Sequence, residues 1–508
     1  WKKQDGNNET IREMFSRVAK EISKAEKRYN KELQKEFQVK FFEMMKNLEF
    51  IPGGRILANA GKDTQLLMNS FVLPVKDRTE DIFETLKQAM IIQKHGGGTG
   101  FDFSALRPKG STTEYTESSA AGPISFIIIL NDASKTITNR GNRKGANMGV
   151  LRVDHPQILD FITLKDKISL EHFNISVGIT EEFMDAVSKN QEYSLIDPYT
   201  KKEVDKLKAR RVFDLISTMA WKTADPGVLF IDNINEKNTT PELGEITTTD
   251  TCGEVPMLGN ESCPLGSINL SKFTKDGEID YDKLKETIHN AVRFLDNSID
   301  VSWYPFSNIE KATKSVRRIG LGIMGWADLL YKLKISYDSN RAVSLARELM
   351  GFINSQADQA SQNLAKEKGN FPSHEKSIFK KENKNRRNAT VTAIAPTGSI
   401  SMLAGTSSSI EPNFALSTMR QLFGDQKILI VNKFFEEAMR AEGLYSESFM
   451  KSLSEKGTLK DMDLPEEIKK TFVVAHDIEP RWHLKIQSAF QENTEGAISK
   501  TINFFILY

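Results

Sequence analysis

The amino-acid sequence predicts an α/β fold, in which a largely parallel sheet is covered by helices. After residue 120, apolar runs rich in β-branched residues alternate with amphipathic segments of helical spacing, and this alternation is typical of such sheets. Of the 508 residues, 39% are hydrophobic, which suffices for a sizeable core. A helical pattern at residues 10–48 precedes the alternation and predicts an N-terminal helical region.

The N-terminal helical pattern starts after Thr10, a residue type that caps helices. Ile11, Phe15 and Val18 then recur on one helical face. A second helix is predicted at 80–94, and it stops at the glycine-rich stretch "GGGTG". The next residues, "FDFSALRP", predict a short strand and a turn.

Later segments predict further strands and helices in turn. The predicted strands lie at 123–130, 148–153, 173–179, 388–395 and 499–504. The predicted helices lie at 181–189, 211–222, 281–299, 323–333, 340–366 and 427–441. Strands joined through helices run parallel, so we expect a parallel sheet.

Charge and cysteine content exclude several classes of protein. Lys and Arg total 69 and Asp and Glu total 68, so we expect neither nucleic acid nor a membrane as a partner. The longest apolar run, "FIIIL", is too short to cross a bilayer, and the N-terminus has no signal-peptide core. Two cysteines do not make a disulfide framework, and their spacing predicts no metal site. We therefore expect a cytoplasmic protein.

The segment "DTCGE" at 250–254 places a cysteine between two acidic residues. If this segment is extended, Asp250, Cys252 and Glu254 point the same way. Two carboxylates disfavour a thiolate, so the setting suits a neutral thiol in hydrogen-atom chemistry better than a nucleophile. The alternative is a buried, inert cysteine in a turn, which is the commoner role of a lone cysteine.

Two further stretches are candidate cradles for a nucleotide. A predicted strand runs into "PTGSI", where backbone N–H groups of 397–401 could hold a phosphate, or could simply begin a serine-capped helix. In "HGGGTGFDF", at 95–103, the glycines either end a helix or let the backbone approach a nucleotide. This stretch is not a dinucleotide-binding fingerprint, because it follows a helix rather than a strand.

Taken together, these stretches resemble the catalytic subunit of ribonucleotide reductases, and most of all the adenosylcobalamin-dependent class II enzymes. The matching segments follow the family order from about residue 50 to 504. They include "FIPGGRILANAG", "NSFVLPV", "GGGTGFDFSALRPKGS", "NRKGANMGVLRVDHPQILDFI", "DTCGE", "CPLGSINL", "RRIGLGIMGWADLL", "APTGSISM", "SSSIEPNFA" and "ISKTINF".

The resemblance implies a ten-stranded α/β barrel of two five-stranded parallel halves, with a finger loop inside. Residues 1–65 would form the N-terminal helical region and 66–508 the barrel, with the final strand and the C-terminal tail absent. It implies radical reduction of ribonucleoside di- or triphosphates to 2′-deoxyribonucleotides for DNA synthesis. It also implies adenosylcobalamin as cofactor, control by deoxynucleoside triphosphate (dNTP) or ATP effectors, and a homodimer.

The resemblance assigns roles to individual residues. Cys252 becomes a thiyl radical that removes the ribose 3′-hydrogen, and Glu254 is the general base at the 3′-hydroxyl. The substrate would contact Asn69, Ser70, Gly96, Gly97 and the phosphate-binding loop of Pro396, Thr397, Gly398, Ser399 and Ile400. The effector would contact Asp77 and Arg107, and the loop 165–174, from Lys165 to Asn174, would relay effector identity.

At two catalytic positions this sequence departs from the family. The family usually has a cysteine at position 70, which pairs with the Cys263 position and supplies two electrons as a disulfide forms. Here the residue is Ser70, whose hydroxyl cannot do this. The family usually has asparagine at position 250, where this chain has Asp250. Asp250 and Glu254 could share a proton.

Three hypotheses follow from these departures. The first is a class II-like reductase, natural or altered by substitution, in which Ser70 makes the standard dithiol turnover doubtful. The second is a divergent reductase that draws electrons from a small external donor such as formate. The third is a non-catalytic paralogue that binds nucleotides and senses deoxynucleotides.

Overall fold

The computed structural model describes residues 8–113, 116–137, 145–421 and 427–503. The N-terminal helical region consists of α1 (Ile11–Ile22), the 3-10 helix η1 (Ser23–Arg28) and α2 (Leu33–Lys46). Thr10 and Glu13 form a reciprocal capping box at the start of α1, as the cap prediction requires. This confirms the predicted helical region. No helix in the described part of the chain is both long and apolar enough to span a bilayer.

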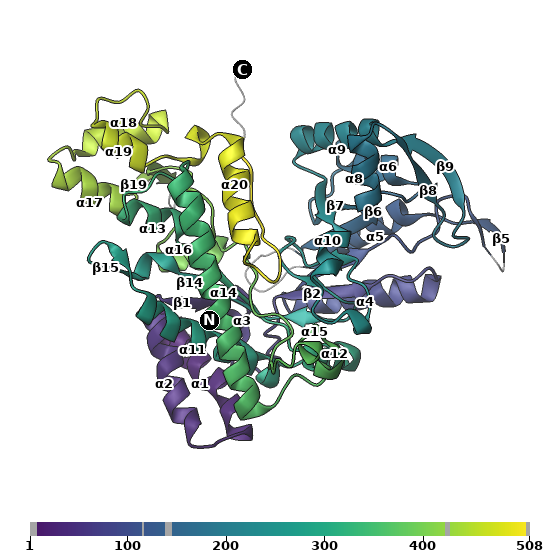
Figure 1. Ribbon diagram of the computed structural model, residues 1–508, viewed down its shortest axis with the longest axis horizontal. Helices are drawn as coiled ribbons and strands as arrows, with labels where there is room; N and C mark the ends of the chain where they lie inside the picture. The colour runs from purple at the N-terminus through teal and green to yellow at the C-terminus, as the bar shows by residue number, and fades with distance from the viewer. Residues whose placement is uncertain (1–7, 114–115, 138–144, 422–426, 504–508) are drawn as a thin grey trace.

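The first half of the fold is a six-stranded sheet with the strand order β10-β7-β6-β3-β2-β13. Neighbouring strands from β2 to β10 are parallel, and β13 pairs antiparallel with β2. Figure 1 shows the helices of this half around β6 and β7. The strands are β2 (Ser70–Pro74), β3 (Gly98–Asp102), β6 (Asn147–Arg152), β7 (Phe173–Ile179), β10 (Gly227–Phe230) and β13 (Ser262–Cys263), and the helices include α4 (Thr79–Lys94), α5 (Pro123–Thr136), α7 (Leu164–Lys167), α8 (Glu181–Ser188) and α9 (Ala209–Thr223).

The second half is a smaller sheet that isolated bridges extend. Strand β14 lies between antiparallel β1 and parallel β17. Parallel bridges then join Leu321 to Thr392 and Ile394 to Ile498. The elements of this half are β1 (Phe50–Pro52), α3 (Gly54–Asn59), β14 (Leu265–Asn269), α11 (Tyr281–Val301), α12 (Ser307–Val316), β17 (Gly320–Met324), α13 (Trp326–Lys332), α14 (Asn340–Lys368), α16 (Gly398–Ala404) and α20 (Pro480–Gln491).

A small unit with its own hydrophobic core lies beside the second half, where Figure 1 shows α17, α18 and α19 together. It contains β18 (Ser417–Gln421), β19 (Lys427–Val431), α17 (Lys433–Ala441), α18 (Glu447–Lys456) and α19 (Glu466–Thr471). The helix predicted at 427–441 is therefore half strand and half helix. Asn432 separates the two parts by capping α17 with its side chain.

Four other element predictions need correction. Residues 123–130 form the start of α5 rather than a strand, because a short buried apolar run does not distinguish the two by periodicity. The helix predicted at 323–333 begins only at Trp326, after β17 and a left-handed Gly325. The segments 388–395 and 499–504 make only isolated bridges or none in their described part, which excludes residue 504.

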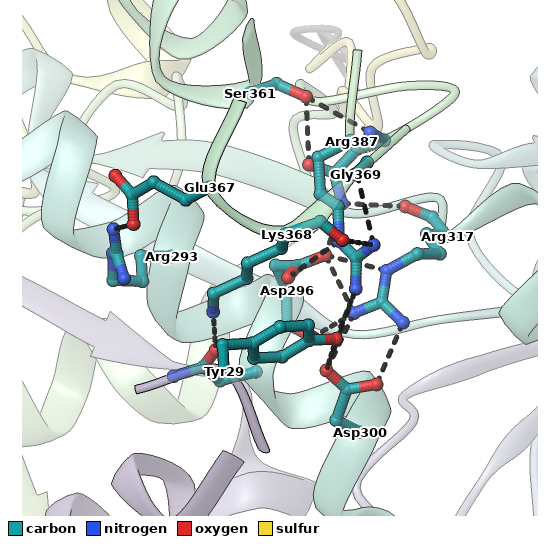
Figure 2. Close-up of polar contacts among 12 residues, drawn as sticks. Tyr29, Arg293, Asp296, Asp300, Arg317, Ser361, Glu367, Lys368, Gly369 and Arg387 are labelled. Atoms are coloured by element: carbon teal, nitrogen blue, oxygen red, sulfur yellow. Dashed lines mark hydrogen bonds and ion pairs between the residues drawn. The ribbon is translucent and has the colours of Figure 1, made fainter. Parts of the chain in front are cut away.

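A buried network of charges fastens the N-terminal helical region to helices of the second half of the fold (Figure 2). Glu26 is fully buried, and its carboxylate accepts hydrogen bonds from Arg293 (3.0 Å) and Lys368 (3.0 Å). Tyr29 accepts a hydrogen bond of 2.6 Å from Arg387. Glu26 is more than 260 residues away in sequence from Arg293 and Lys368.

The same network continues into the second half of the fold through Asp296. Its carboxylate accepts hydrogen bonds from Arg317 (2.9 Å) and Asn388 (3.0 Å). Although burial favours the protonated form, the guanidinium groups of Arg317 and Arg387 lower the pKa of Asp296 to about 2. Buried charges are tolerated here because each has an opposite partner.

Removing Glu26 should destabilise the whole chain. We expect Glu26→Ala to lower the free energy of unfolding by about 3–5 kcal/mol, because Lys368 and Arg293 would keep buried charges without this partner. Urea unfolding followed by circular dichroism measures this. The matched control is Glu43→Ala on α2, which removes an exposed ion pair with Lys46 and should change stability by less than about 1 kcal/mol. Equal effects of the two substitutions would contradict the anchoring role.

Candidate active site

Cys252 lies in the turn of a short β-hairpin. Strands β11 (Thr248–Thr249) and β12 (Pro256–Met257) pair antiparallel, and the chain turns between them. Gly253 has a left-handed φ of 92°. The expectation of an extended 250–254 is therefore wrong. The turn separates the three side chains, so that Cys252 is exposed whereas Asp250 and Glu254 are buried.

The hairpin lies directly on β3, where two glycines make room for it. A Cβ atom at Gly100 would lie 1.8 Å from the carbonyl oxygen of Thr249, and one at Gly98 would lie 2.6 Å from the hydroxyl of Thr251. Thr248 also donates a hydrogen bond of 3.2 Å to the carbonyl oxygen of Phe101. Gly98 and Gly100 of the "GGGTG" stretch therefore set the position of the cysteine turn. The sequence suggests a helix end or a nucleotide contact for this stretch, and neither includes this role.

The first two glycines of the same stretch fit both interpretations. Gly96 follows the end of α4 with a φ of 93°, as a helix-ending glycine does. Gly96 and Gly97 also line a cavity of about 350 Å³, which we call the first cavity. A Cβ atom at Gly96 would lie 2.1 Å from the guanidinium of Arg55. Arg55 lines this cavity too, and sequence reasoning missed it although it lies within the "FIPGGRILANAG" segment.

The first cavity brings the predicted catalytic and substrate residues together. Its wall combines the cysteine turn, the start of β2, the glycines after α4 and the start of α16. Of the predicted residues, the wall contains Asn69, Ser70, Gly96, Gly97, Cys252, Glu254, Pro396, Thr397, Gly398, Ser399 and Ile400. The start of α16 faces the cavity, and a helix N-terminus favours an anionic group.

Ser70 and Cys263 are direct neighbours on paired strands. They are opposite each other in the antiparallel register of β2 and β13. The Ser70 hydroxyl donates a hydrogen bond to the carboxylate of Asp250. The other oxygen of Asp250 accepts from the backbone N–H of Val255 (3.0 Å) and the hydroxyl of Thr249 (3.1 Å). The structure thus places both departures from the family pattern, Ser70 and Asp250, in contact.

Asp250 and Glu254 are both buried, and the pKa of each carboxyl group is raised. Burial, and then the charge of Asp250, raise the pKa of Glu254 well above its ordinary value. Burial also raises the pKa of Asp250, although its hydrogen bond from Ser70 opposes this. One Glu254 oxygen is buried without a hydrogen-bond partner. Burial and the charge of Asp250 likewise raise the pKa of the Cys263 thiol, so this thiol is protonated at neutral pH.

A second cavity of about 700 Å³ meets the first at the cysteine turn. Its wall includes Gly253, the strand β10 and residues 495–500. Among the described residues, Cys252 alone lines both cavities. A thiol in this place can exchange a hydrogen atom or proton with a ligand in either cavity.

The predicted effector residues lie in three separate contacts. Arg107 donates through Nε to the carboxylate of Asp77, and its guanidinium lies 4.3 Å from the ring centre of Tyr199. Lys165 donates a hydrogen bond of 2.6 Å to Asp225. Asn174 donates one of 2.8 Å to the carbonyl oxygen of Thr251. Their role towards an effector stays a prediction.

Comparisons with known proteins identify relatives over the whole chain. Residues 68–505 match the model of the ribonucleotide reductase barrel domain, and residues 1–65 match that of the ribonucleotide reductase all-alpha domain. The chain is 48% identical over 467 residues to a vitamin B12-dependent ribonucleoside-diphosphate reductase of Thermoplasma acidophilum, a match that covers 91% of this chain and 61% of the relative. A protein of the same name from Mycobacterium tuberculosis is 43% identical over 498 residues, which cover 97% of this chain and 72% of that protein.

One solved structure supports the fold. It is the class Id ribonucleotide reductase alpha subunit of Actinobacillus ureae, with a TM-score of 0.78 and 23% sequence identity. The match covers 97% of this chain and 87% of that one. The chain spans 61% of the Thermoplasma protein and 72% of the Mycobacterium protein.

A side chain at Gly100 should disturb the hairpin. We expect Gly100→Ala to lower the free energy of unfolding by about 1–3 kcal/mol, because the new methyl group would collide with the Thr249 carbonyl, a backbone atom. The control is Gly54→Ala, where no atom lies within 4 Å of the new Cβ. Urea unfolding of both variants checks this, and an unchanged Gly100→Ala protein would show that the hairpin does not rest on β3.

The raised pKa of Glu254 predicts a pH-dependent stability. Below the ordinary glutamate pKa, the side chain is protonated in both the folded and the unfolded chain, so its titration does not affect stability. As pH rises from the ordinary pKa towards the raised one, the unfolded chain loses this proton first, and keeping Glu254 buried costs stability. We therefore expect the free energy of unfolding of Glu254→Gln, relative to that of the unmodified chain, to increase with pH by up to about 1.4 kcal/mol per pH unit.

Unfolding free energies from pH 4 to 9 measure this difference. The control is Glu84→Gln on the surface, where a hydrogen bond from Lys87 lowers the pKa of Glu84. The Glu84–Lys87 pair contributes stability above the ordinary glutamate pKa. The free energy of unfolding of Glu84→Gln, relative to that of the unmodified chain, should therefore decrease as pH rises. A difference for Glu254→Gln that stays constant with pH would contradict the assigned pKa direction.

Proposed function

The chain belongs to the ribonucleotide reductase large-subunit family, and from this premise we propose that it reduces ribonucleotides to 2′-deoxyribonucleotides by radical chemistry at Cys252. The observation that carries the proposal is the place of Cys252 in the turn between two cavities, with Glu254 on the wall of the first cavity and Cys263 buried opposite Ser70. The relatives named above are ribonucleoside-diphosphate reductases, which favours diphosphates as substrates. The product would serve DNA synthesis.

The substrate fits the first cavity in one orientation. Its phosphates would lie at Pro396–Ile400, where the N-terminus of α16 and the Arg55 side chain favour an anion. Its ribose would then lie over Cys252 and Glu254. The glycines Gly96 and Gly97 leave room for the ribose and base, and Asn69 would contribute its side chain from the wall.

The reaction would proceed on the ribose through these side chains. Cys252, once its S–H hydrogen has been removed, takes the 3′-hydrogen and re-forms the S–H bond. Glu254 exchanges a proton with the 3′-hydroxyl, and its buried oxygen without a hydrogen-bond partner is open to such a contact. The 2′-hydroxyl gains a proton and leaves as water. The full reaction then requires two electrons and two protons in total, and Cys263 can contribute one hydrogen atom.

Adenosylcobalamin is the radical source that we propose, and the second cavity suits it. The cavity is the larger of the two, and its wall joins apolar residues of β10 to polar side chains such as Gln487 and Gln491. Cys252 and Gly253 lie on the same wall. When bound, this cofactor supplies a carbon-centred radical that can accept a hydrogen atom from a thiol.

Ser70 favours an external electron donor as a second hypothesis. Ser70 is opposite Cys263 in the register of β2 and β13, which supports position 70 as the place of a disulfide partner. Cys263 therefore has no thiol opposite it at position 70 with which to form a disulfide and release two electrons. A small reductant such as formate, which yields carbon dioxide, a proton and two electrons, would complete the balance.

We further propose that the fold is a ten-stranded barrel. The first half has five parallel strands, β2, β3, β6, β7 and β10, and the second has four, namely β14, β17, the segment 391–394 and the segment at Ile498. Strand β10 is the last in its sheet, and its Val228 and Phe230 are 40% and 45% exposed. One further strand at this edge, beside the second cavity, would make ten.

Regulation by deoxynucleotides and ATP at a homodimer interface completes the proposal. Helices α4 and α5 contact each other, and both expose large apolar side chains, Phe83 (50%) and Ile129 (40%). Exposed apolar groups on adjacent helices favour a protein contact. Asp77 and Arg107, close to the start of α4, would bind the effector there. Two free cysteines suit a cytoplasmic location.

An assay of position 70 tests the proposal. With adenosylcobalamin, a ribonucleoside diphosphate and dithiothreitol, we expect the unmodified chain to begin turnover and to release free base rather than deoxynucleotide. Ser70→Cys should increase dithiol-dependent product formation at least about tenfold, because it restores a thiol opposite Cys263. Asp250→Asn in the same chain should increase it further, since Asn can donate as well as accept. Deoxynucleotides are measured by chromatography.

Controls separate the alternatives. Cys252→Ser should abolish both free-base release and product, since a hydroxyl hydrogen is too strongly bound to be removed. Product with formate, but not with dithiothreitol, would favour the external donor. If the unmodified chain turns over efficiently with dithiothreitol alone, the role assigned to position 70 is wrong. If no variant reacts but nucleotides still bind, the chain is a nucleotide sensor.

A further inference from the structure

One side chain of the first sheet reaches the cysteine turn. Asn174 is the second residue of β7, and its Nδ2 donates a hydrogen bond of 2.8 Å to the carbonyl oxygen of Thr251, the residue before Cys252. Side chains alternate along a strand. Phe173 and Ile175 are therefore buried in the core, whereas Asn174 is exposed on the face where the hairpin lies.

Thr251 is held from a second direction by β3. Its hydroxyl lies where a Cβ atom at Gly98 would be only 2.6 Å away, so side chain and strand are in close contact. The peptide that precedes Cys252 is thus fixed by packing on one strand and by a hydrogen bond from another. The bond from Asn174 adds to the packing on Gly98 and to the pairing of the hairpin itself.

The position of Asn174 depends on the 165–174 loop. Asp225 accepts a hydrogen bond from Lys165 at the start of this loop (2.6 Å) and another from the backbone N–H of Ile175 just after it (3.1 Å). The side chains of Lys165 and Asp225 are only 16% and 15% exposed, so water screens their contact weakly. One carboxylate therefore ties both ends of the loop together, next to Asn174.

We propose that Asn174 is a positioning residue for Cys252, and that it connects the 165–174 loop to the thiol. The carboxamide N–H holds the turn so that the thiol faces the ribose site. Movement of the loop shifts β7 at Asn174 and, through the hydrogen bond, the turn. The regulatory half of this inference rests on the proposed control by deoxynucleotides, whereas the positioning half rests on the contacts alone.

The reactivity of Cys252 tests the positioning half. Iodoacetamide should modify exposed Cys252, and buried Cys263 is an internal reference in the same mass spectrum. We expect Asn174→Leu, which keeps the side-chain shape but has no N–H, and Asn174→Ala to react about two- to tenfold faster, as for loss of one hydrogen bond. The matched control is Asn370→Ala, which removes an exposed amide bonded to Asn385 instead, and its rate should not change.

A kinetic measurement distinguishes positioning from general damage. In the Ser70→Cys background, Asn174→Leu should reduce kcat by a similar factor, with unchanged nucleotide affinity and melting temperature. Rates of alkylation and turnover equal to those of the unmodified residue would overturn the inference. So would equal effects of Asn174→Leu and Asn370→Ala.

A separate measurement tests the regulatory half of the inference. Saturating dATP or dTTP should change the Cys252 alkylation rate of the unmodified chain, and should no longer change it in Asn174→Leu although equilibrium dialysis shows the same nucleotide affinity. An unaltered response in Asn174→Leu would overturn the connection. If neither nucleotide binds to the unmodified chain, the effector part of the proposed function is wrong, while the alkylation rates without nucleotide still decide the role of Asn174.

Discussion

The geometry of the site depends on one backbone contact, the approach of the Thr249 carbonyl to Gly100. Any side chain on β3 at this point would lift the hairpin from the sheet. With the hairpin in place, three things follow together: Cys252 reaches the cavities, Glu254 turns inward beside Asp250, and Asp250 meets the hydroxyl of Ser70. A rigid sheet supports a short turn, which is how reactive groups are commonly held.

The charged network around Glu26 and Asp296 lies away from the cysteine turn and holds the N-terminal helical region in place. It joins η1, α11 and α14, and it reaches Asn388 just before the segment that leads to the predicted phosphate-binding loop. Ion pairs of this kind contribute little net stability compared with apolar packing, but they tolerate few alternative arrangements. The network therefore fixes the N-terminal helical region in one orientation on the second half of the fold.

Much of this could be predicted from the sequence, for identifiable reasons. Helices α4, α9 and α14 and strands β6 and β7 have clear periodicity and were predicted to within a few residues. The predicted substrate residues meet in one cavity because the motif order, rather than any single motif, specified them. The apolar run "FIIIL" was misread because its period is ambiguous. Contacts between distant residues, such as Glu26 with Lys368 or Asn174 with Thr251, leave no local pattern in the sequence.

The cysteine turn also separates the two cavities, because Cys252 is the one residue of the described chain that lines both. Ligands in the two cavities would both contact this side chain, and a displacement of it by one ligand would change the affinity for the other. Thermodynamic linkage requires such an effect to be mutual. If a ligand in the first cavity changed the affinity of the second cavity for its ligand by some factor, the second ligand would change the affinity of the first by the same factor. The order of binding would then not affect the final complex, and the Cys252 side chain would be the contact that couples the two sites.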